Sequence, residues 1–125
     1  MGGKDTFTAK VPKVIKEHEF FEKWINNIDG TLLLRIMAAI AKIESEGLIT
    51  DAKSLQNGLY EKKWNSGLRL YFAVIEENGK KTLLVLGSGK DREQQQAIEK
   101  SKKALEKFKV VTENIKYNPN KREEI

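Results

Sequence analysis

A hairpin of two strongly apolar strands is the clearest structural signal in the sequence. Residues 68–76 alternate between two faces, residues 81–86 end in the apolar run LLVL, and Asn78-Gly79 lies between them. Asn-Gly is the dipeptide that most favours a tight turn between antiparallel strands. The LLVL run is apolar at every position, which predicts a central strand covered on both faces. These residues therefore predict the middle of a β-sheet.

Helices are predicted on both sides of this hairpin along the chain. Apolar residues recur at helical spacing from Glu17 to Asp29-Gly30, and a second helical stripe runs on to Gly47, where that helix should stop. Asp91 fits the N-cap of a third helix, with Gln94 as its capping-box partner. The buried stripe of this third helix should consist of Ile98, Ser101, Leu105 and Phe108.

Two more strands and a loop complete the predicted order. Residues 7–15 suit an edge strand, because Pro12 would interrupt the hydrogen bonds of a central one. Residues 48–58 are predicted to be a polar loop, followed by a strand over 60–65 and a turn up to Gly67. The order is β-α-α-β-β-β-α, which indicates an α+β fold with an antiparallel sheet packed against helices.

Length and composition limit the class of protein. A chain of 125 residues is long enough for one domain with its own core. We place that domain at 1–108, with a flexible arm at 1–6 and a C-terminal extension or tail at 109–125. The sequence has no cysteine and a single histidine, His18, which excludes disulfides and argues against a histidine metal site or a Ser-His-Asp triad. With no apolar run near the roughly 18 residues of a membrane span and no apolar signal core, we expect a cytoplasmic protein that does not bind membranes.

Positive charge is concentrated on the predicted strands. Seven basic residues face three acidic ones between positions 53 and 90, in a chain whose net charge is +5. Such a surface favours a polyanionic partner, RNA first among them. Strand alternation places Arg69 and Tyr71 on the face opposite the apolar residues, with Glu61 and Lys63 beside them. We expect this face to be open to solvent.

The predicted patch has groups suited to a phosphodiester. Lys63, Arg69 and Lys90 can neutralise a phosphate and its transition-state charge. Tyr71 or Trp64 can stack on a base, and Glu61 can accept the proton of a 2′-hydroxyl that attacks the adjacent phosphorus.

A plainer interpretation of the same residues stays open at this point. Exposed sheet faces often carry basic residues only to remain soluble and to block edge pairing. Lys62 falls on the apolar face by alternation, so either it snorkels at the sheet margin or the strand is bulged.

The chain resembles the RelE/HigB superfamily of bacterial and phage type II toxins, and is most similar to its phage-derived Gp49-like, or addiction-module killer, branch. The resemblance covers about residues 7–108. It is carried by four segments in order: GLYEKK at 58–63, GLRLYF at 67–72, LLVLGSGK at 83–90, and QQAI at 95–98 with Ala104 after it.

The resemblance implies a RelE-like, microbial-RNase-like fold and an activity. The expected activity is an mRNA endoribonuclease, or mRNA interferase, that commonly cuts mRNA in the ribosome and uses neither metal nor cofactor. The expected partners are mRNA together with the ribosome, and a cognate antitoxin, usually a helix-turn-helix DNA-binding protein. The complex is expected to contact promoter DNA only through this antitoxin.

Site residues follow from the matched segments. The implied catalytic residues are Arg69 and Lys63 at the phosphate, Glu61 as general base and Lys90 as added charge. The implied RNA-binding residues are Lys62, Trp64, Tyr71 and Arg92.

One departure from the family leaves alternatives. Well-studied relatives have a Tyr or His, which acts in proton transfer, near the start of the last helix or at the C-terminus. Near the start of its last predicted helix this chain has Gln94-Gln95-Gln96-Ala97. Tyr117 would have to fold back to replace it. The alternatives are a ParE-like inhibitor of DNA gyrase on the same fold, or a non-catalytic module that binds RNA or a protein partner.

Overall fold

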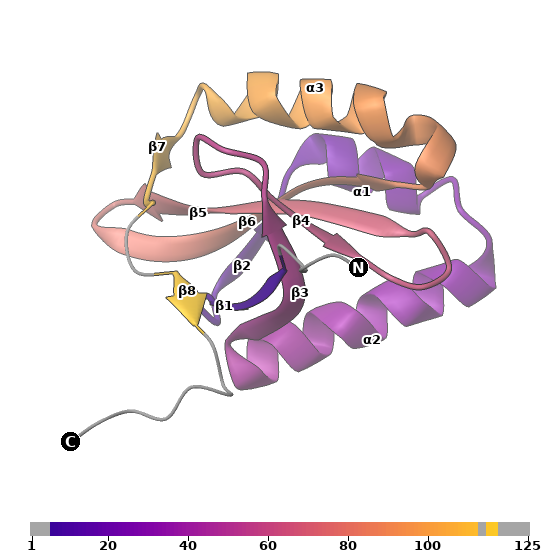
Figure 1. Ribbon diagram of the computed structural model, residues 1–125, viewed down its shortest axis with the longest axis horizontal. Helices are drawn as coiled ribbons and strands as arrows, with labels where there is room; N and C mark the ends of the chain where they lie inside the picture. Colours follow the sequence, from indigo (N-terminus) through magenta and orange to yellow (C-terminus); the bar gives the residue numbers. More distant parts are fainter. Residues whose placement is uncertain (1–5, 113–114, 118–125) are drawn as a thin grey trace.

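A computed structural model describes residues 6–112 and 115–117 and shows an α+β fold in which helices pack on both sides of a mixed sheet (Figure 1). In chain order the elements are β1 (Phe7–Lys10), β2 (Ile15–Glu17), α1 (Glu19–Ile25), α2 (Gly30–Glu46), β3 (Leu48–Ser54), β4 (Tyr60–Lys63), β5 (Arg69–Glu77), β6 (Lys80–Gly89), the short 3-10 helix η1 (Asp91–Glu93), α3 (Gln94–Leu105), β7 (Lys109–Val110) and β8 (Lys116–Tyr117). Most of the predicted arm at 1–6, and residues 113–114 and 118–125 of the predicted tail, lie outside the described residues.

The strand order of the sheet is β2-β6-β5-β4-β3-β1-β8, and β7 pairs with the far end of β5. All these pairs are antiparallel except β2 with β6, which run parallel. The prediction of a purely antiparallel sheet is therefore wrong at this edge. After β1 the chain runs along the outer side of β6 before it enters α1, and the amide of His18 still donates to the carbonyl of Val85.

The β5–β6 hairpin is confirmed at the centre of the sheet. Asn78 and Gly79 both have positive φ, at 52° and 78°, the backbone that a two-residue turn of this hand requires. The four residues of the LLVL run are 0% exposed, as a strand covered on both faces must be. The register shifts by one residue between Tyr71 and Phe72, so a β-bulge interrupts the β5–β6 ladder there.

Each face of the sheet is covered by helices. On one face Leu70 and Val85 pack with Ile36 of α2 and Phe21 of α1. On the other face Tyr71 packs with Leu105 and other apolar residues of α3, and Figure 1 shows α2 and α3 on opposite sides of the strands. The predicted division of β5 into two faces is confirmed, but the second face is a second core and not an open surface.

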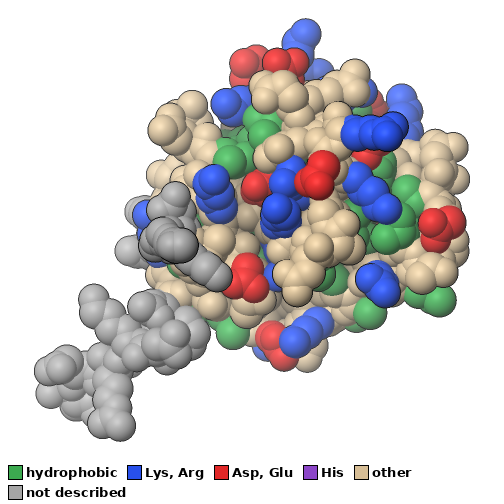
Figure 2. All heavy atoms as spheres, turned by 45° about the vertical axis from the view of Figure 1, so that its right-hand side comes forward, with side chains coloured by type: hydrophobic (Ala, Val, Ile, Leu, Met, Phe, Trp, Pro, Cys, Tyr) green, Lys and Arg blue, Asp and Glu red, His purple; other side chains and the backbone are tan. Residues whose placement is uncertain are grey.

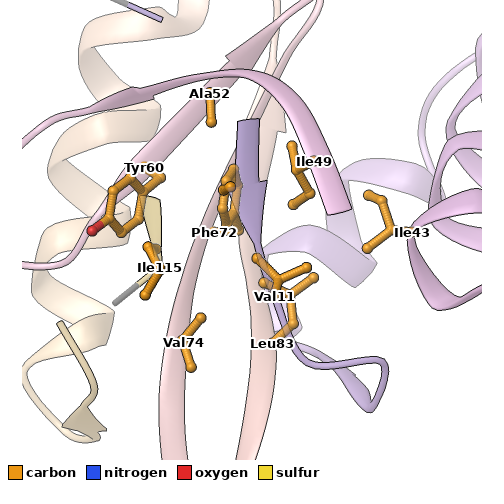
Figure 3. Close-up of a cluster of buried hydrophobic side chains, with 10 residues drawn as sticks. Val11, Ile43, Ile49, Ala52, Tyr60, Phe72, Val74, Leu83 and Ile115 are labelled. Atoms are coloured by element: carbon orange, nitrogen blue, oxygen red, sulfur yellow. The ribbon is translucent and has the colours of Figure 1, made fainter. Parts of the chain in front are cut away.

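A third apolar cluster joins the two ends of the described chain. Phe72, Val74 and Leu83 from the central strands meet Ile49 of β3 and Ile115, which precedes β8 (Figure 3). Ile115 is 4% exposed. Part of the predicted extension after position 108 therefore contributes to the sheet and to its core.

Two predictions, a loop at 48–58 and one edge strand at 7–15, are wrong because the strands there are defined by their partners in the sheet. Residues 48–54 form β3 and not a loop, because Ile49 and Ala52 point inward while β1 and β4 on either side satisfy the backbone. The predicted edge strand at 7–15 is two strands: β1 lies between β3 and β8, and β2 lies on β6. Pro12 is in the connection between them, where it interrupts no ladder.

The first two helices begin and end at capping residues. The Nδ1 atom of His18 accepts from the amide of Phe20 and caps α1, and the side chain of Asp29 accepts from the amide of Leu32 at the start of α2. Gly47, at φ 71°, ends α2 at the predicted position. No helix in the described part of the chain is long and apolar enough to cross a membrane.

Candidate functional site

Three of the predicted site residues meet beneath the start of α3. Glu61 of β4 lies opposite Tyr71 of β5, and Lys63 lies opposite Arg69 in the same ladder. The Tyr71 hydroxyl donates to Oε2 of Glu61 at 2.9 Å, and Nε of Arg69 lies 3.8 Å from that oxygen. Directly opposed residues on neighbouring strands share a face, so the β4–β5 register brings the carboxylate, the phenol and the guanidinium together.

This cluster is buried, contrary to prediction. Glu61 is 6% exposed, Arg69 is 7% exposed and Tyr71 is 0% exposed. The alternation argument placed them correctly on the face opposite Leu70, but it did not include the helix that follows β6. Leu105 and Ala104 of α3 pack on that face and exclude solvent.

Arg69 retains unused hydrogen-bonding capacity. Its Nη2 atom pairs with Oδ1 of Asp91 at 3.0 Å. Its Nε and Nη1 atoms are buried, and neither has a hydrogen-bond partner among the described residues. A buried donor without a partner costs about 1–3 kcal/mol. An anion that reached these two nitrogens would recover that cost.

Glu61 is held by two donors through one oxygen. In addition to the Tyr71 hydroxyl, Nε2 of Gln94 donates to Oε2 at 3.2 Å, which ties the start of α3 to β4. Burial, and then the hydrogen bond to Glu61, raise the pKa of Tyr71. Tyr71 therefore stays a neutral donor that orients the carboxylate, and it has no exposed ring on which a base could stack.

Four exposed basic residues surround the buried cluster, and we call them the basic rim: Lys53, Lys63, Lys90 and Arg92. Lys63 opposes Arg69, and Lys53 opposes Glu61 from the β3 side. Lys90 and Arg92 flank Asp91 where the chain leaves β6. Lys53 was missed as a site residue because its strand was predicted to be a loop, and its register with Glu61 is invisible without β3.

The other two predicted RNA-binding residues lie on the opposite face. Nζ of Lys62 donates to the Thr50 carbonyl at 2.8 Å and lies 4.9 Å from the ring centre of Trp64. Trp64 packs with the cluster that α1 and α2 cover. The expectation that Lys62 lies on the apolar face is confirmed, and the predicted RNA-binding residues are therefore divided between two faces. On the face turned forward in Figure 2, basic side chains are likewise spread out with acidic ones among them.

Asp91 and Gln94 have roles that the sequence did not indicate. The predicted N-cap at Asp91 is wrong: Lys90 is the cap of η1, its amide donates to Oε1 of Glu93, and the Asp91 carboxylate is free to bind Arg69. Gln94, the first residue of α3, donates to Glu61 from its side chain. Tyr117 does not fold back to this end of α3, because it pairs with Thr8 at the far end of the strand order from β5.

Comparisons with family models, with curated proteins and with solved structures find no match for this chain.

Proposed function

We propose that this chain is a toxin of the RelE/HigB type, with the RelE-like fold, that binds RNA at the basic rim and cleaves it without a metal. The observation that carries the proposal is the buried Arg69 beside Glu61, with two guanidinium nitrogens unused under four exposed cations. In the proposed toxin the natural counterpart would be an antitoxin that restrains it, and the natural substrate would be mRNA on the ribosome.

The proposed chemistry is a transfer of the phosphodiester to the neighbouring 2′-oxygen. Arg69 binds the non-bridging oxygens as charge develops on them, where one such donor is worth about 10²–10³ in rate. Glu61 accepts the 2′-hydroxyl proton, and its position is fixed by Tyr71. The lysines of the basic rim are exposed and can reach a bound RNA. The ammonium group of one of them gives a proton to the leaving 5′-oxygen.

The phosphate must displace Asp91 to reach Arg69. The side chain of Asp91 is 69% exposed although its partner is 9% exposed, so the carboxylate can turn into solvent while Arg69 stays in place. In the free protein, the Asp91 carboxylate therefore occupies a place beside the Arg69 guanidinium that a phosphate oxygen would take.

A specific observation also supports a non-catalytic RNA-binding module as a second candidate. Both donors to Glu61 use the same oxygen in a cluster that is nearly closed to solvent, and this arrangement also serves simply to lock α3 onto the sheet. In that case the basic rim binds RNA and the buried cluster is structural.

The test is induced expression in a bacterial host, with growth recorded and mRNA 5′ ends mapped. Lys63→Ala/Lys90→Ala is the better variant, because both residues are exposed, whereas Arg69→Ala removes a buried ion-pair partner and perturbs the fold as well. We expect growth arrest and new cuts inside translated frames for the wild type, and cleavage about tenfold slower in the double variant.

Lys81→Ala, which removes an exposed lysine from the start of β6, is the control and should cleave as the wild type does. Arrest with intact mRNA would point to a ParE-like action on gyrase. RNA binding with neither growth arrest nor new cuts would favour the non-catalytic RNA-binding module.

A further inference from the structure

A groove with an apolar floor lies between α2 and the face of β3 and β4, on the side of the sheet away from the Arg69 cluster. Its volume is about 490 Å³. The lining residues are Ala38, Ala39 and Ile43 of α2, Leu48, Ile49 and Thr50 of β3, and Trp64, Ser66 and Leu68 around the β4–β5 turn, with charged residues at its edges. A hollow of this size accommodates apolar side chains of a partner.

The charges around this groove are mostly positive. Arg35, Lys42 and Lys62 line it, and Glu46 is its one carboxylate among the described lining residues. Arg35 and Lys42 are seven residues apart, so they lie on one side of α2 about two turns apart. Asp51 lies near Lys62 and offsets part of this charge, but the edges stay net positive, so the groove favours a partner that brings negative charge to them.

Lys62 is fixed in a position that favours an anion and disfavours a stacked base. Its ammonium donates to the Thr50 carbonyl and lies over the Trp64 ring, so that face of the indole is occupied. Burial lowers the pKa of Lys62. A desolvated cation of this kind gains from a carboxylate placed nearby, and a nucleotide base finds no free aromatic face on that side of Trp64.

The outer side of α2 continues the apolar surface beyond the groove. Leu34 is 70% exposed. Leu34 lies four residues before Ala38, so it is next to the groove on the helix surface. A single exposed apolar residue is common, but Leu34 adjoins a hollow with an apolar floor and extends the area that a partner can cover.

We propose that this groove binds an acidic amphipathic segment of another protein, with its apolar side chains in the hollow and its carboxylates at Arg35, Lys42 and Lys62. The segment lies along α2 on the face of β3 and β4. This inference does not rest on the proposed ribonuclease activity, because none of these three residues belongs to the basic rim or to the Arg69 cluster.

The test uses the full chain, labelled with nitrogen-15, and three probes observed by NMR. The probes are a synthetic helix-forming peptide with Leu on one face and Glu on the other, the same peptide with Lys in place of Glu, and an oligouridylate. We expect the acidic peptide to shift the amides of Ala39, Lys42 and Thr50, which line the groove away from the basic rim, and the basic peptide and the oligouridylate to leave them unchanged.

Charge reversal tests the electrostatic part. Arg35→Glu/Lys42→Glu changes two exposed residues, and it should lower the affinity for the acidic peptide about tenfold or more. Lys102→Glu makes a similar change on α3, across the sheet, and should leave the affinity unchanged. Growth arrest and RNA cleavage by the double variant should match the wild type, which separates this test from that of the proposed function.

Three results would overturn the proposal: no shift at these amides with the acidic peptide, equal binding of both peptides, or a larger shift at the groove with the oligouridylate. The last result would make this face the nucleic-acid surface.

Discussion

At the scale of single residues, Asp91 controls access to Arg69. Its carboxylate binds Nη2 and brings negative charge to the place where a phosphate would bind. Asp91→Asn removes the charge and keeps the size, so we expect an oligouridylate to bind several-fold more tightly to the variant. Fluorescence anisotropy with a labelled oligouridylate measures this, and Glu99→Gln, an exposed neutralisation on the outer side of α3, is the control. Equal affinities for Asp91→Asn and wild type would mean that RNA does not approach Arg69.

The ionisation of Tyr71 should appear in the pH dependence of the free energy of unfolding. Its pKa is raised in the folded protein, mainly by burial, above its ordinary value of about 10. Below pH 10 both the folded and the unfolded chain hold the proton. Above it the unfolded chain releases the proton first, so the stability contributed by the neutral phenol falls as pH rises, by at most about 1.4 kcal/mol per pH unit.

Tyr71→Phe tests this linkage. At pH 8 the variant should be less stable by about 1–3 kcal/mol, because Glu61 loses a buried donor. From pH 10 to 11 the difference between variant and wild type should narrow, since the variant has no phenol to ionise at this position. Urea denaturation at each pH gives both quantities, with Tyr117→Phe as a control that removes an exposed hydroxyl. A difference that stays constant over this range would contradict the buried hydrogen bond.

At the scale of elements, the packing of β7 against the connection between β3 and β4 depends on Gly58. Its φ is 85°, and a Cβ there would overlap Cγ1 of Val110 on β7. Gly79 has a similar φ of 78° but nothing within 4 Å of an added Cβ. The two glycines therefore form a matched pair in which only Gly58 also makes a close contact.

Substitution by alanine should separate the two effects. Gly79→Ala should cost about 1 kcal/mol, from the positive φ alone. Gly58→Ala should cost about 2–4 kcal/mol, because it adds the displacement of β7 from β5. Urea denaturation of both variants measures the free energies of unfolding. Equal losses would mean that β7 yields without cost and is not a fixed part of the sheet.

The elements also show how far local sequence determines this fold. The β5–β6 hairpin and the C-terminal end of α2 follow from signals within a few residues, namely Asn78-Gly79, the LLVL run and Gly47, and they were predicted. Strand β3 has only Ile49 and Ala52 facing inward, and it is a strand because β1 and β4 flank it, which no local pattern reveals. Short strands such as β2, β7 and β8 exist only through their partners for the same reason.

The candidate site shows the same limit. Alternation along β4 and β5 was enough to place Glu61, Arg69 and Tyr71 on one face. Their burial depends on α3 folding back over that face, and the pairing of Arg69 with Asp91 depends on where η1 bends. These are long-range consequences of packing, so Glu61, Arg69 and Tyr71 were predicted to share a face, whereas their burial and their contacts with Asp91 and Gln94 were not predicted.

At the scale of the whole molecule, a net charge of +5 attracts any polyanion, so affinity for RNA alone does not locate a site. The salt dependence of RNA binding in single variants does locate the site. If the four residues of the basic rim each neutralise one phosphate of single-stranded RNA, the logarithm of the binding constant should fall with the logarithm of salt concentration at a slope of about −3, since each contact contributes about −0.7.

Removing one rim contact should change that slope by a known amount. We expect Lys63→Ala to reduce its magnitude by about 0.7, because one fewer counterion is released. Lys42→Ala removes an exposed lysine from the groove beside α2, on the opposite side of the sheet, and should leave the slope unchanged. Anisotropy titrations with an oligouridylate at several salt concentrations give the three slopes. If Lys42→Ala reduces the slope and Lys63→Ala does not, RNA binds on the α2 face, and the buried Arg69 cluster serves only to hold α3 on the sheet.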